Sequence, residues 1–113
     1  GKLEMNEGMI VENIVAQMLV ASGHRLYFYS NPDRKKKENR MEIDFLIAKS
    51  KLTNRHNISP IEVKSGKRYA LTSLRKCIQK YHDYLATPYV THTDNVMLSD
   101  GIVYIPLYMV PLL

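Results

Sequence analysis

Residues 60–66 read Pro-Ile-Glu-Val-Lys-Ser-Gly, and this segment decides the fold. Two apolar residues alternate with Glu62 and Lys64, which is the pattern of a strand with one buried face. Because side chains two residues apart leave a strand on the same side, Glu62 and Lys64 are expected to lie next to each other. An acid and a lysine held together between apolar neighbours form the first part of a candidate site.

A second alternating segment, 41–47, precedes this one and predicts another strand. Its odd-numbered residues are apolar and share one face, whereas Asp44 belongs to the opposite face. The two strands are expected to be neighbours, with 17 residues between Asp44 and Glu62. Magnesium prefers oxygen ligands and takes one or two protein carboxylates together with waters and phosphate oxygens. We therefore expect Asp44 and Glu62 to bind Mg²⁺ or Mn²⁺, and Lys64 to orient a water molecule or hold a phosphate.

The first predicted helix brings a third carboxylate. Asn6 is a favourable N-cap, and apolar residues recur at three- and four-residue spacing from there to Gly23. Glu12 lies at the edge of the resulting apolar stripe, where a charged side chain usually has a partner. A supporting role at the metal site is one interpretation of Glu12, and an ion pair with a nearby basic residue is the alternative.

The remaining segments complete an α/β fold. A strand over 25–29, a second helix over 71–85 and short strands over 89–92 and 102–105 give the order α-β-β-β-α-β-β. We expect residues 1–113 to form a single domain in which a central mixed sheet is flanked by helices. The composition, 45% apolar and 24% charged, is typical of a globular domain.

Positive charge is concentrated in the middle of the chain. Residues 34–80 hold 14 Lys and Arg against four acids, a balance of +10, whereas the whole chain carries +5. Clustered cations attract phosphate backbones through counterion release, so nucleic acid is a candidate partner, with DNA favoured over RNA. A solvated surface loop is the alternative. The candidate nucleic-acid-binding residues are Arg34, Lys35, Lys36, Lys37, Lys67 and Arg68.

Several other classes of protein find no support in the sequence. The apolar runs are short of the ~20 residues that a membrane helix needs. A lone Cys77 cannot form an internal disulfide, and no signal segment opens the chain, so a cytoplasmic protein is expected. The histidines lack zinc-like spacing, and each is expected in a turn or at the surface. Residues 32–35 repeat the acid-x-Lys pattern within a polar turn, and we interpret them as loop.

Together these residues resemble the PD-(D/E)XK, or restriction-endonuclease-like, nuclease superfamily. The resemblance implies a restriction-endonuclease-like core in which Asp44 and Glu62 bind the metal, Lys64 is the catalytic lysine and Glu12 is a supporting acid. One branch is more similar, namely the domain of unknown function that follows the ATPase module in many bacterial and archaeal AAA-type ATPases. The segments that carry this resemblance are 8–13, 42–47, 60–66, 73–74 and 105–108.

That branch implies an N-terminal ATPase module as a partner. The sequence contains no GxxxxGK[ST] phosphate-binding loop, so ATP turnover is not expected from this chain. Gly1 in place of an initiator Met indicates a piece of a longer protein, which would then be the C-terminal domain of such an ATPase.

Three functions remain open from the sequence. The first is a metal-dependent phosphodiesterase that cuts nucleic acid. The second is a non-catalytic module that docks nucleic acid or a protein and regulates the attached ATPase. The third is an oligomerisation domain, for which the apolar tail 107–113 is the only support.

Overall fold

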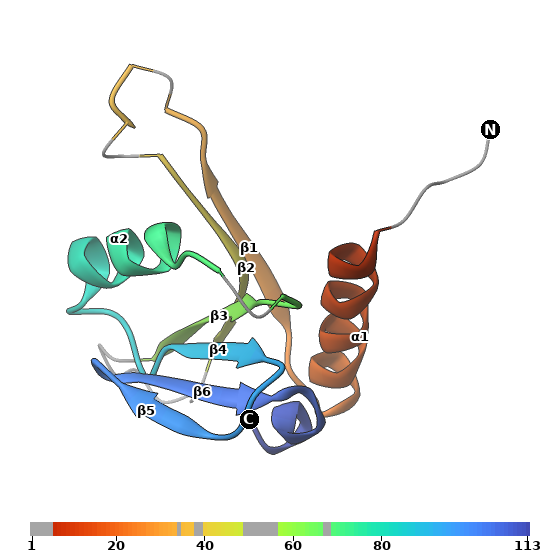
Figure 1. Ribbon diagram of the computed structural model, residues 1–113. Helices are drawn as coiled ribbons and strands as arrows, with labels where there is room; N and C mark the ends of the chain where they lie inside the picture. The colour runs from red at the N-terminus through yellow and green to blue at the C-terminus, as the bar shows by residue number, and fades with distance from the viewer. Residues whose placement is uncertain (1–5, 34, 38–39, 49–56, 67–68) are drawn as a thin grey trace.

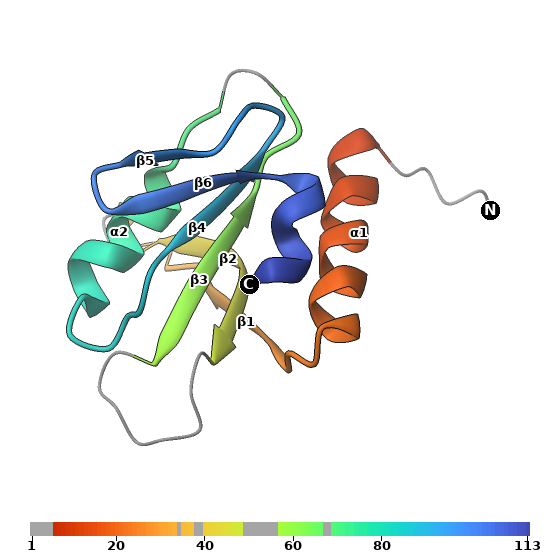
Figure 2. The same ribbon diagram turned by 90° about the horizontal axis from the view of Figure 1, so that it is seen from below.

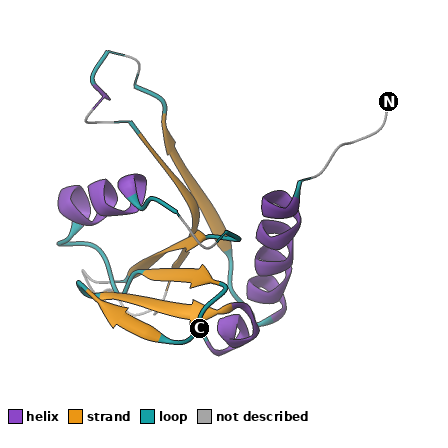
Figure 3. Ribbon diagram, viewed as in Figure 1, coloured by secondary structure: helices purple, strands orange, loops and turns teal. Residues whose placement is uncertain are grey.

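The computed structural model describes residues 6–33, 35–37, 40–48, 57–66 and 69–113, and these form a mixed α/β fold (Figures 1 and 3). The predicted order of helices and strands is confirmed in outline. The elements are α1 (Glu7–Ala21), β1 (Leu26–Asn31), β2 (Met41–Ala48), β3 (Ile58–Val63), α2 (Thr72–Tyr81), β4 (Tyr89–His92), β5 (Met97–Ser99), β6 (Ile102–Pro106) and the 3-10 helix η2 (Leu107–Leu112).

The strands form one six-stranded mixed sheet in the order β1-β2-β3-β4-β6-β5. The first three strands are an antiparallel meander. β4 then lies parallel to β3, and β6 lies parallel to β4. Parallel neighbouring strands need a crossover connection. The crossover from β3 to β4 contains the helix α2. The carboxyl ends of β3 and β4 therefore meet at the same edge of the sheet.

Helices cover both faces of the sheet, as the two perpendicular views show (Figures 1 and 2). On one face, Leu74 and Cys77 of α2 pack on strand residues that include Val90 and Tyr104. On the other face, α1 and η2 pack on the opposite side chains of the same strands. This second cluster contains Val15, Leu19, Phe45, Ile47, Ile61, Ile105 and Val110.

An irregularity in β2 changes which face its apolar residues cover. Between the pairs Tyr27–Leu46 and Tyr29–Ile43, β1 contributes one residue whereas β2 contributes two, Asp44 and Phe45. This extra residue is a β-bulge, which bends a strand and redirects its side chains. Burial alternates along 41–47 as predicted, but the prediction that the odd-numbered residues share one face is therefore wrong. Ile43 packs beneath α2, whereas Phe45 packs beneath α1, and Asp44 lies at the change of face.

The predicted start of the first helix is confirmed. The side chain of Asn6 accepts a hydrogen bond from the backbone N–H of Met9 at 2.9 Å, and the helix ends before Gly23, whose φ of 93° suits glycine.

We expect Asn6→Ala to lower the free energy of unfolding by about 1 kcal/mol, because an N–H at the helix start loses its acceptor. Urea unfolding followed by circular dichroism measures this loss. Asn13→Ala, an exposed mid-helix exchange in α1, is the matched control and should leave stability unchanged or slightly raised. Equal stability of the Asn6 variant and the parent would show that the cap contributes nothing.

Three sequence predictions are corrected at the C-terminal half. The edge strand β5 was not predicted, because its residues are exposed and show no alternation of burial. The second helix ends at Tyr81 rather than continuing to residue 85, since Leu85 forms a bridge with Ile58 beside the sheet. His92 is not at the surface but is buried at the end of β4.

The apolar tail 107–113 packs largely against its own chain. Val110 is fully buried in the cluster under α1, and the side chain of His24 lies 2.7 Å from the carbonyl oxygen of Leu113, to which its Nε2 donates. These contacts occupy much of the surface on which an oligomerisation role was based. No helix in the described part of the chain combines the length and the apolar character that a membrane crossing requires.

Candidate metal and phosphate site

The strands β2 and β3 separate at the candidate site. Phe45 and Ile61 form the last pair of their antiparallel ladder. One residue further, β2 continues along β1 and β3 continues along β4, where the backbone N–H of Lys64 donates to the carbonyl of Thr91 at 2.8 Å. Two backbone strands that diverge leave N–H groups without ladder partners, and such groups need other acceptors.

Two carboxylates supply those acceptors. The backbone N–H of Asp44 donates to Oε1 of Glu62 at 3.1 Å, and the backbone N–H of Val63 donates to Oδ2 of Asp44 at 2.7 Å. Each strand thus lends a side chain to the backbone of the other. This reciprocal arrangement fixes both carboxylates at the fork between the strands.

Lys64 completes this group of three residues, which we call the fork site. Its Nζ lies 3.4 Å from Oε2 of Glu62. The two side chains differ in exposure, with 6% of Glu62 accessible against 25% of Lys64. The ammonium group therefore lies at the mouth of the site, with the glutamate beneath it.

Burial of two neighbouring acids determines the charge of the fork site. Removal from water, followed by the charge of Asp44, raises the pKa of Glu62 from 4.5 to about 7. Burial also raises the pKa of Asp44, although the hydrogen bond from Val63 and the charge of Lys64 oppose this rise. The site therefore holds negative charge that Lys64 only partly compensates.

Glu12 lies near the fork site without joining it directly. Burial, followed by the charge of Asp44, raises the pKa of this half-buried glutamate. The first turn of α1 also approaches the loop after β3, because a Cβ placed on Gly8 would lie 3.6 Å from Oγ of Ser65. Among the described residues, however, no three His, Cys, Asp or Glu side chains gather closely enough to hold a metal ion.

The two carboxylates of the fork site nevertheless suit a hard divalent cation. Magnesium retains several waters and needs only one or two protein carboxylates when phosphate oxygens complete its shell. A cation would also relieve the repulsion from Asp44 that contributes to the high pKa of Glu62. The donor set therefore fits Mg²⁺ or Mn²⁺ held by Asp44 and Glu62.

Comparison with known families places this chain in one of them. Residues 7–110 match the family described as "Domain of unknown function (DUF4143)". The chain belongs to this family. The match covers α1 through most of η2, and so includes the whole sheet and the fork site. No curated protein and no solved structure matches the chain.

The predicted nucleic-acid-binding residues lie in part at the tip of the β1–β2 hairpin, which projects from the sheet (Figure 1). Lys35, Lys36 and Lys37 are exposed there, whereas Arg34, Lys67 and Arg68 lie outside the described residues. Asp33 accepts hydrogen bonds from the backbone N–H groups of Lys35 and Lys36, which agrees with its interpretation as a loop residue.

Helix α2 holds this basic tip in place. The Nζ of Lys76 donates to the carbonyls of Lys37 at 2.9 Å and Arg40 at 3.1 Å. The hydroxyl of Ser73 accepts from the backbone N–H of Glu42 at 3.1 Å, where β2 begins. The tip is therefore tied to the same helix that covers one face of the fork strands.

The sequence pattern did not indicate one hydrogen-bonded pair, the partly buried Tyr69 and the buried His92. The hydroxyl of Tyr69 lies 3.3 Å from Nδ1 of His92, although the two residues are far apart in sequence. One signal was available, because His92 is the last residue of the short strand predicted over 89–92. Its partner could not be deduced, since Tyr69 precedes α2 and only the crossover to β4 brings the two together.

Proposed function

We propose that this domain is a divalent-metal-dependent phosphodiesterase that acts on nucleic acid, with DNA as the expected substrate. The observation that carries the proposal is the fork site, where Asp44 and Glu62 are fixed by each other's backbone and Lys64 lies 3.4 Å from Glu62. Paired acids beside an ammonium group are the residue types that phosphoryl transfer with a metal ion requires.

Each residue of the fork site has a distinct role in this proposal. Asp44 and Glu62 hold Mg²⁺ or Mn²⁺, which when bound lowers the pKa of a coordinated water and offsets charge on the scissile phosphate. Lys64, which is more exposed than Glu62, contacts the phosphate or the attacking water as a point charge. Glu12, whose pKa is raised by burial and by the charge of Asp44, is a positioning residue rather than a ligand in this proposal.

The topology supports a restriction-endonuclease-like assignment of this fold. A helix, an antiparallel three-stranded meander, a crossover helix and a parallel strand follow one another in that order. This is the core that the resemblance to PD-(D/E)XK nucleases implies. The role as an accessory domain of an AAA-type ATPase rests on the sequence resemblance alone.

The basic hairpin tip supplies a candidate contact for the phosphate backbone. The strand from Met41 to Asp44 spans about 10 Å at 3.3 Å per residue. A stacked nucleic-acid strand advances about 3.4 Å per nucleotide, and the tip lies beyond Met41, so at least about three nucleotides separate the tip from the fork site. One strand could therefore contact Lys36 and the fork site together.

We expect Lys36→Gln to reduce the salt dependence of oligonucleotide binding, lowering the slope of log K against log salt by about one. Fluorescence anisotropy across a range of salt concentrations measures this slope. The matched control is Lys80→Gln, an exposed lysine on α2 that has no place in the proposed footprint. Identical slopes for the parent and the Lys36 variant would remove the hairpin tip from the interface.

The direct test of the proposed activity is cleavage of labelled single-stranded and duplex DNA and RNA with Mg²⁺ or Mn²⁺. We expect metal-dependent cleavage that a chelator stops, with the same products in every preparation. Cleavage by a contaminating nuclease would persist in a preparation of Asp44→Asn, whereas cleavage by this domain would be lost. Cleavage that persists in that variant would contradict the assignment of the fork site.

A non-catalytic docking module of the ATPase is the second candidate function. The observation that favours it is the pKa of Glu62, which leaves that side chain largely protonated below about 7 and so less able to hold a metal. If the domain is such a docking module, we expect salt-dependent nucleic-acid binding that requires no metal and is unchanged in Asp44→Asn.

A further inference from the structure

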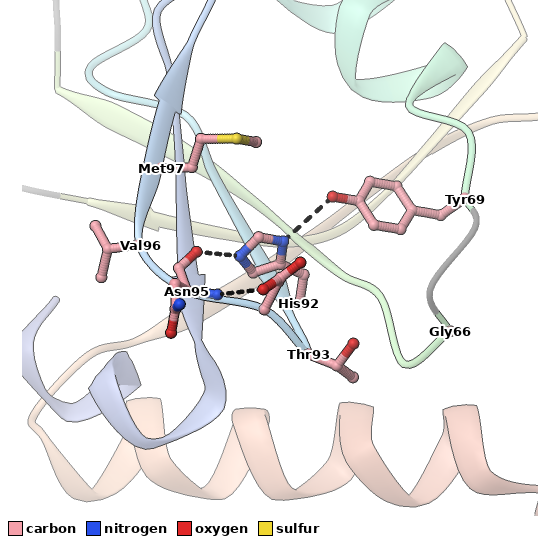
Figure 4. A pocket seen from close by; sticks show the side chains of 8 residues that line it. Gly66, Tyr69, His92, Thr93, Asn95, Val96 and Met97 are labelled. Carbon is pink, nitrogen blue, oxygen red and sulfur yellow. Dashed lines mark hydrogen bonds between the residues drawn. The ribbon is translucent and has the colours of Figure 1, made fainter.

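A cavity of about 590 Å³ lies at the carboxyl ends of β3 and β4, beside the fork site (Figure 4). Gly66 and Tyr69 line it from the chain after β3, and residues 92–97 line it from the end of β4 to the start of β5. We call it the His92 pocket. Its volume lies within the range of roughly 300–1,000 Å³ that is usual for small-molecule sites.

Hydrogen bonds fix one wall of the pocket. His92 is only 7% exposed, and its Nε2 lies 2.7 Å from the carbonyl oxygen of Asn95. Because a carbonyl can only accept, Nε2 carries the proton and Nδ1 accepts from the hydroxyl of Tyr69. The His92 ring also packs on Tyr104, with the ring centroids 5.5 Å apart. Figure 4 shows the Tyr69 and His92 side chains pointing toward each other.

The pocket is directly continuous with the fork site along the backbone. Lys64 pairs with Thr91, the residue before His92, through the bond from its N–H to the Thr91 carbonyl. Gly66 lies two residues beyond Lys64, a span of at most about 7 Å. The wall of the pocket at Gly66 therefore begins within about 7 Å of the Lys64 backbone, a length that one nucleotide can bridge.

The lining residues show which part of a nucleotide suits the pocket. Asp94 is the charged residue among the described lining residues, and a carboxylate repels phosphate but accepts from N–H groups. Thr93 and Asn95 add a hydroxyl and an amide, while the partly exposed ring of Tyr69 offers a flat surface beside the largely buried His92. Aromatic surfaces combined with polar groups at the edge are what a nucleobase removed from its stack requires.

We propose that the His92 pocket receives one unstacked nucleobase of the strand whose phosphate lies at the fork site, and that it prefers a base with an exocyclic amino group. Guanine, adenine and cytosine can donate to Asp94 through such a group. Uracil and thymine have only the ring N3–H, which lies between two carbonyl oxygens that a carboxylate repels. The proposal rests on the proposed function for the position of the phosphate. It narrows the substrate to nucleic acid with an unpaired nucleotide at that position, such as a single strand or a frayed end.

The test uses nucleosides, which carry no phosphate and need no metal. Guanosine, cytidine, adenosine and uridine are titrated into the isotopically labelled protein, and amide shifts of residues 92–97 are followed by NMR. We expect the three amino-bearing nucleosides to shift these amides, with uridine binding about tenfold more weakly. Asp94→Asn should remove that preference, and Thr93→Val should weaken binding without removing it. Asp83→Asn, at an exposed site on the chain after α2, is the charge-matched control and should change neither.

The results separate this inference from the proposed function. Nucleoside binding should persist in Asp44→Asn, because that change affects the metal site alone. Absence of shifts at residues 92–97 with every nucleoside, or an unchanged preference for the amino-bearing nucleosides in Asp94→Asn, would overturn the pocket assignment. Neither of these results would bear on metal-dependent cleavage, which depends on the fork site. Conversely, a variant that loses cleavage through the fork site should bind nucleosides like the parent.

Discussion

Replacement of Lys64 by glutamine is expected to lower metal-dependent cleavage by at least about 100-fold while the protein still binds Mg²⁺. The ammonium group lies 3.4 Å from Glu62 at the mouth of the fork site. In the proposed function it acts on the phosphate or the water, whereas the two carboxylates hold the metal. Glutamine keeps most of the length of the side chain but carries no charge. Initial cleavage rates and calorimetric Mg²⁺ titrations on the same preparations measure the two properties separately.

Two further variants make this result specific. Lys64→Arg keeps the charge with a different shape, and we expect it to retain more activity than the glutamine variant. Lys80→Gln removes a lysine of α2 and should leave the rate unchanged. A Lys64→Gln variant that cleaves as fast as the parent would show that Lys64 has no part in the chemistry.

The second large effect concerns Glu62 and the pH dependence of stability in the metal-free protein. The pKa of Glu62 is about 7 in the folded state against 4.5 as its ordinary value, so folding favours the protonated form. Its contribution to stability is fully present below about pH 4.5 and is lost as the pH rises through 7. The total loss is about 3–4 kcal/mol, since one pKa unit corresponds to about 1.4 kcal/mol.

Glu62→Gln is expected to remove this loss. Above pH 7 the variant should be more stable than the metal-free parent, whereas near pH 4.5 the two should be alike. Urea unfolding at a series of pH values measures the difference. Asp83→Asn, which neutralises an exposed acid, is the control and should follow the parent. Parallel stability curves for the parent and Glu62→Gln would show that Glu62 ionises without penalty in the folded state.

The same linkage predicts that Mg²⁺ stabilises the parent most where Glu62 is ionised. A metal that binds the folded state alone adds stability according to its concentration relative to its dissociation constant. Because the metal competes with a proton on Glu62, this stabilisation should grow as the pH rises through about 7.

The strand pattern alone was enough to predict much of the candidate site. Alternation identified Glu62 and Lys64 as neighbours on one side of a strand, and the short connection placed Asp44 on the next strand. The structure has these three residues together. The N-cap Asn6 was predictable for a similar reason, because its hydrogen bond joins residues only three apart in sequence.

Features that depend on pairing between distant segments could not be predicted. The bulge at Asp44 exists because β1 supplies one residue where β2 supplies two, and neither sequence shows this alone. The fork arises because β3 continues along β4, a partner chosen by the crossover through α2. His92 looked like a surface histidine, since its partner Tyr69 becomes visible only in three dimensions.

The first helix shows a further limit of sequence patterns. Its apolar residues surround most of the helix, so that Met9, Ile10 and Val20 are exposed while Val15 and Leu19 are buried. A stripe that wide indicates a helix without fixing which side faces the sheet. The edge position expected for Glu12 was therefore less definite than the positions of the strand residues.

Calorimetric titration of Mg²⁺ and Mn²⁺ into the parent and Asp44→Asn tests the central claim most directly. The titration is run about one pH unit above 7, where Glu62 is ionised, with Asp83→Asn as the exposed control. Asparagine can still accept from the Val63 N–H, so the variant should fold like the parent. We predict binding by the parent and the control, and loss of binding in Asp44→Asn. Failure of the parent to bind either metal, even with an oligonucleotide present to supply phosphate oxygens, would contradict the account.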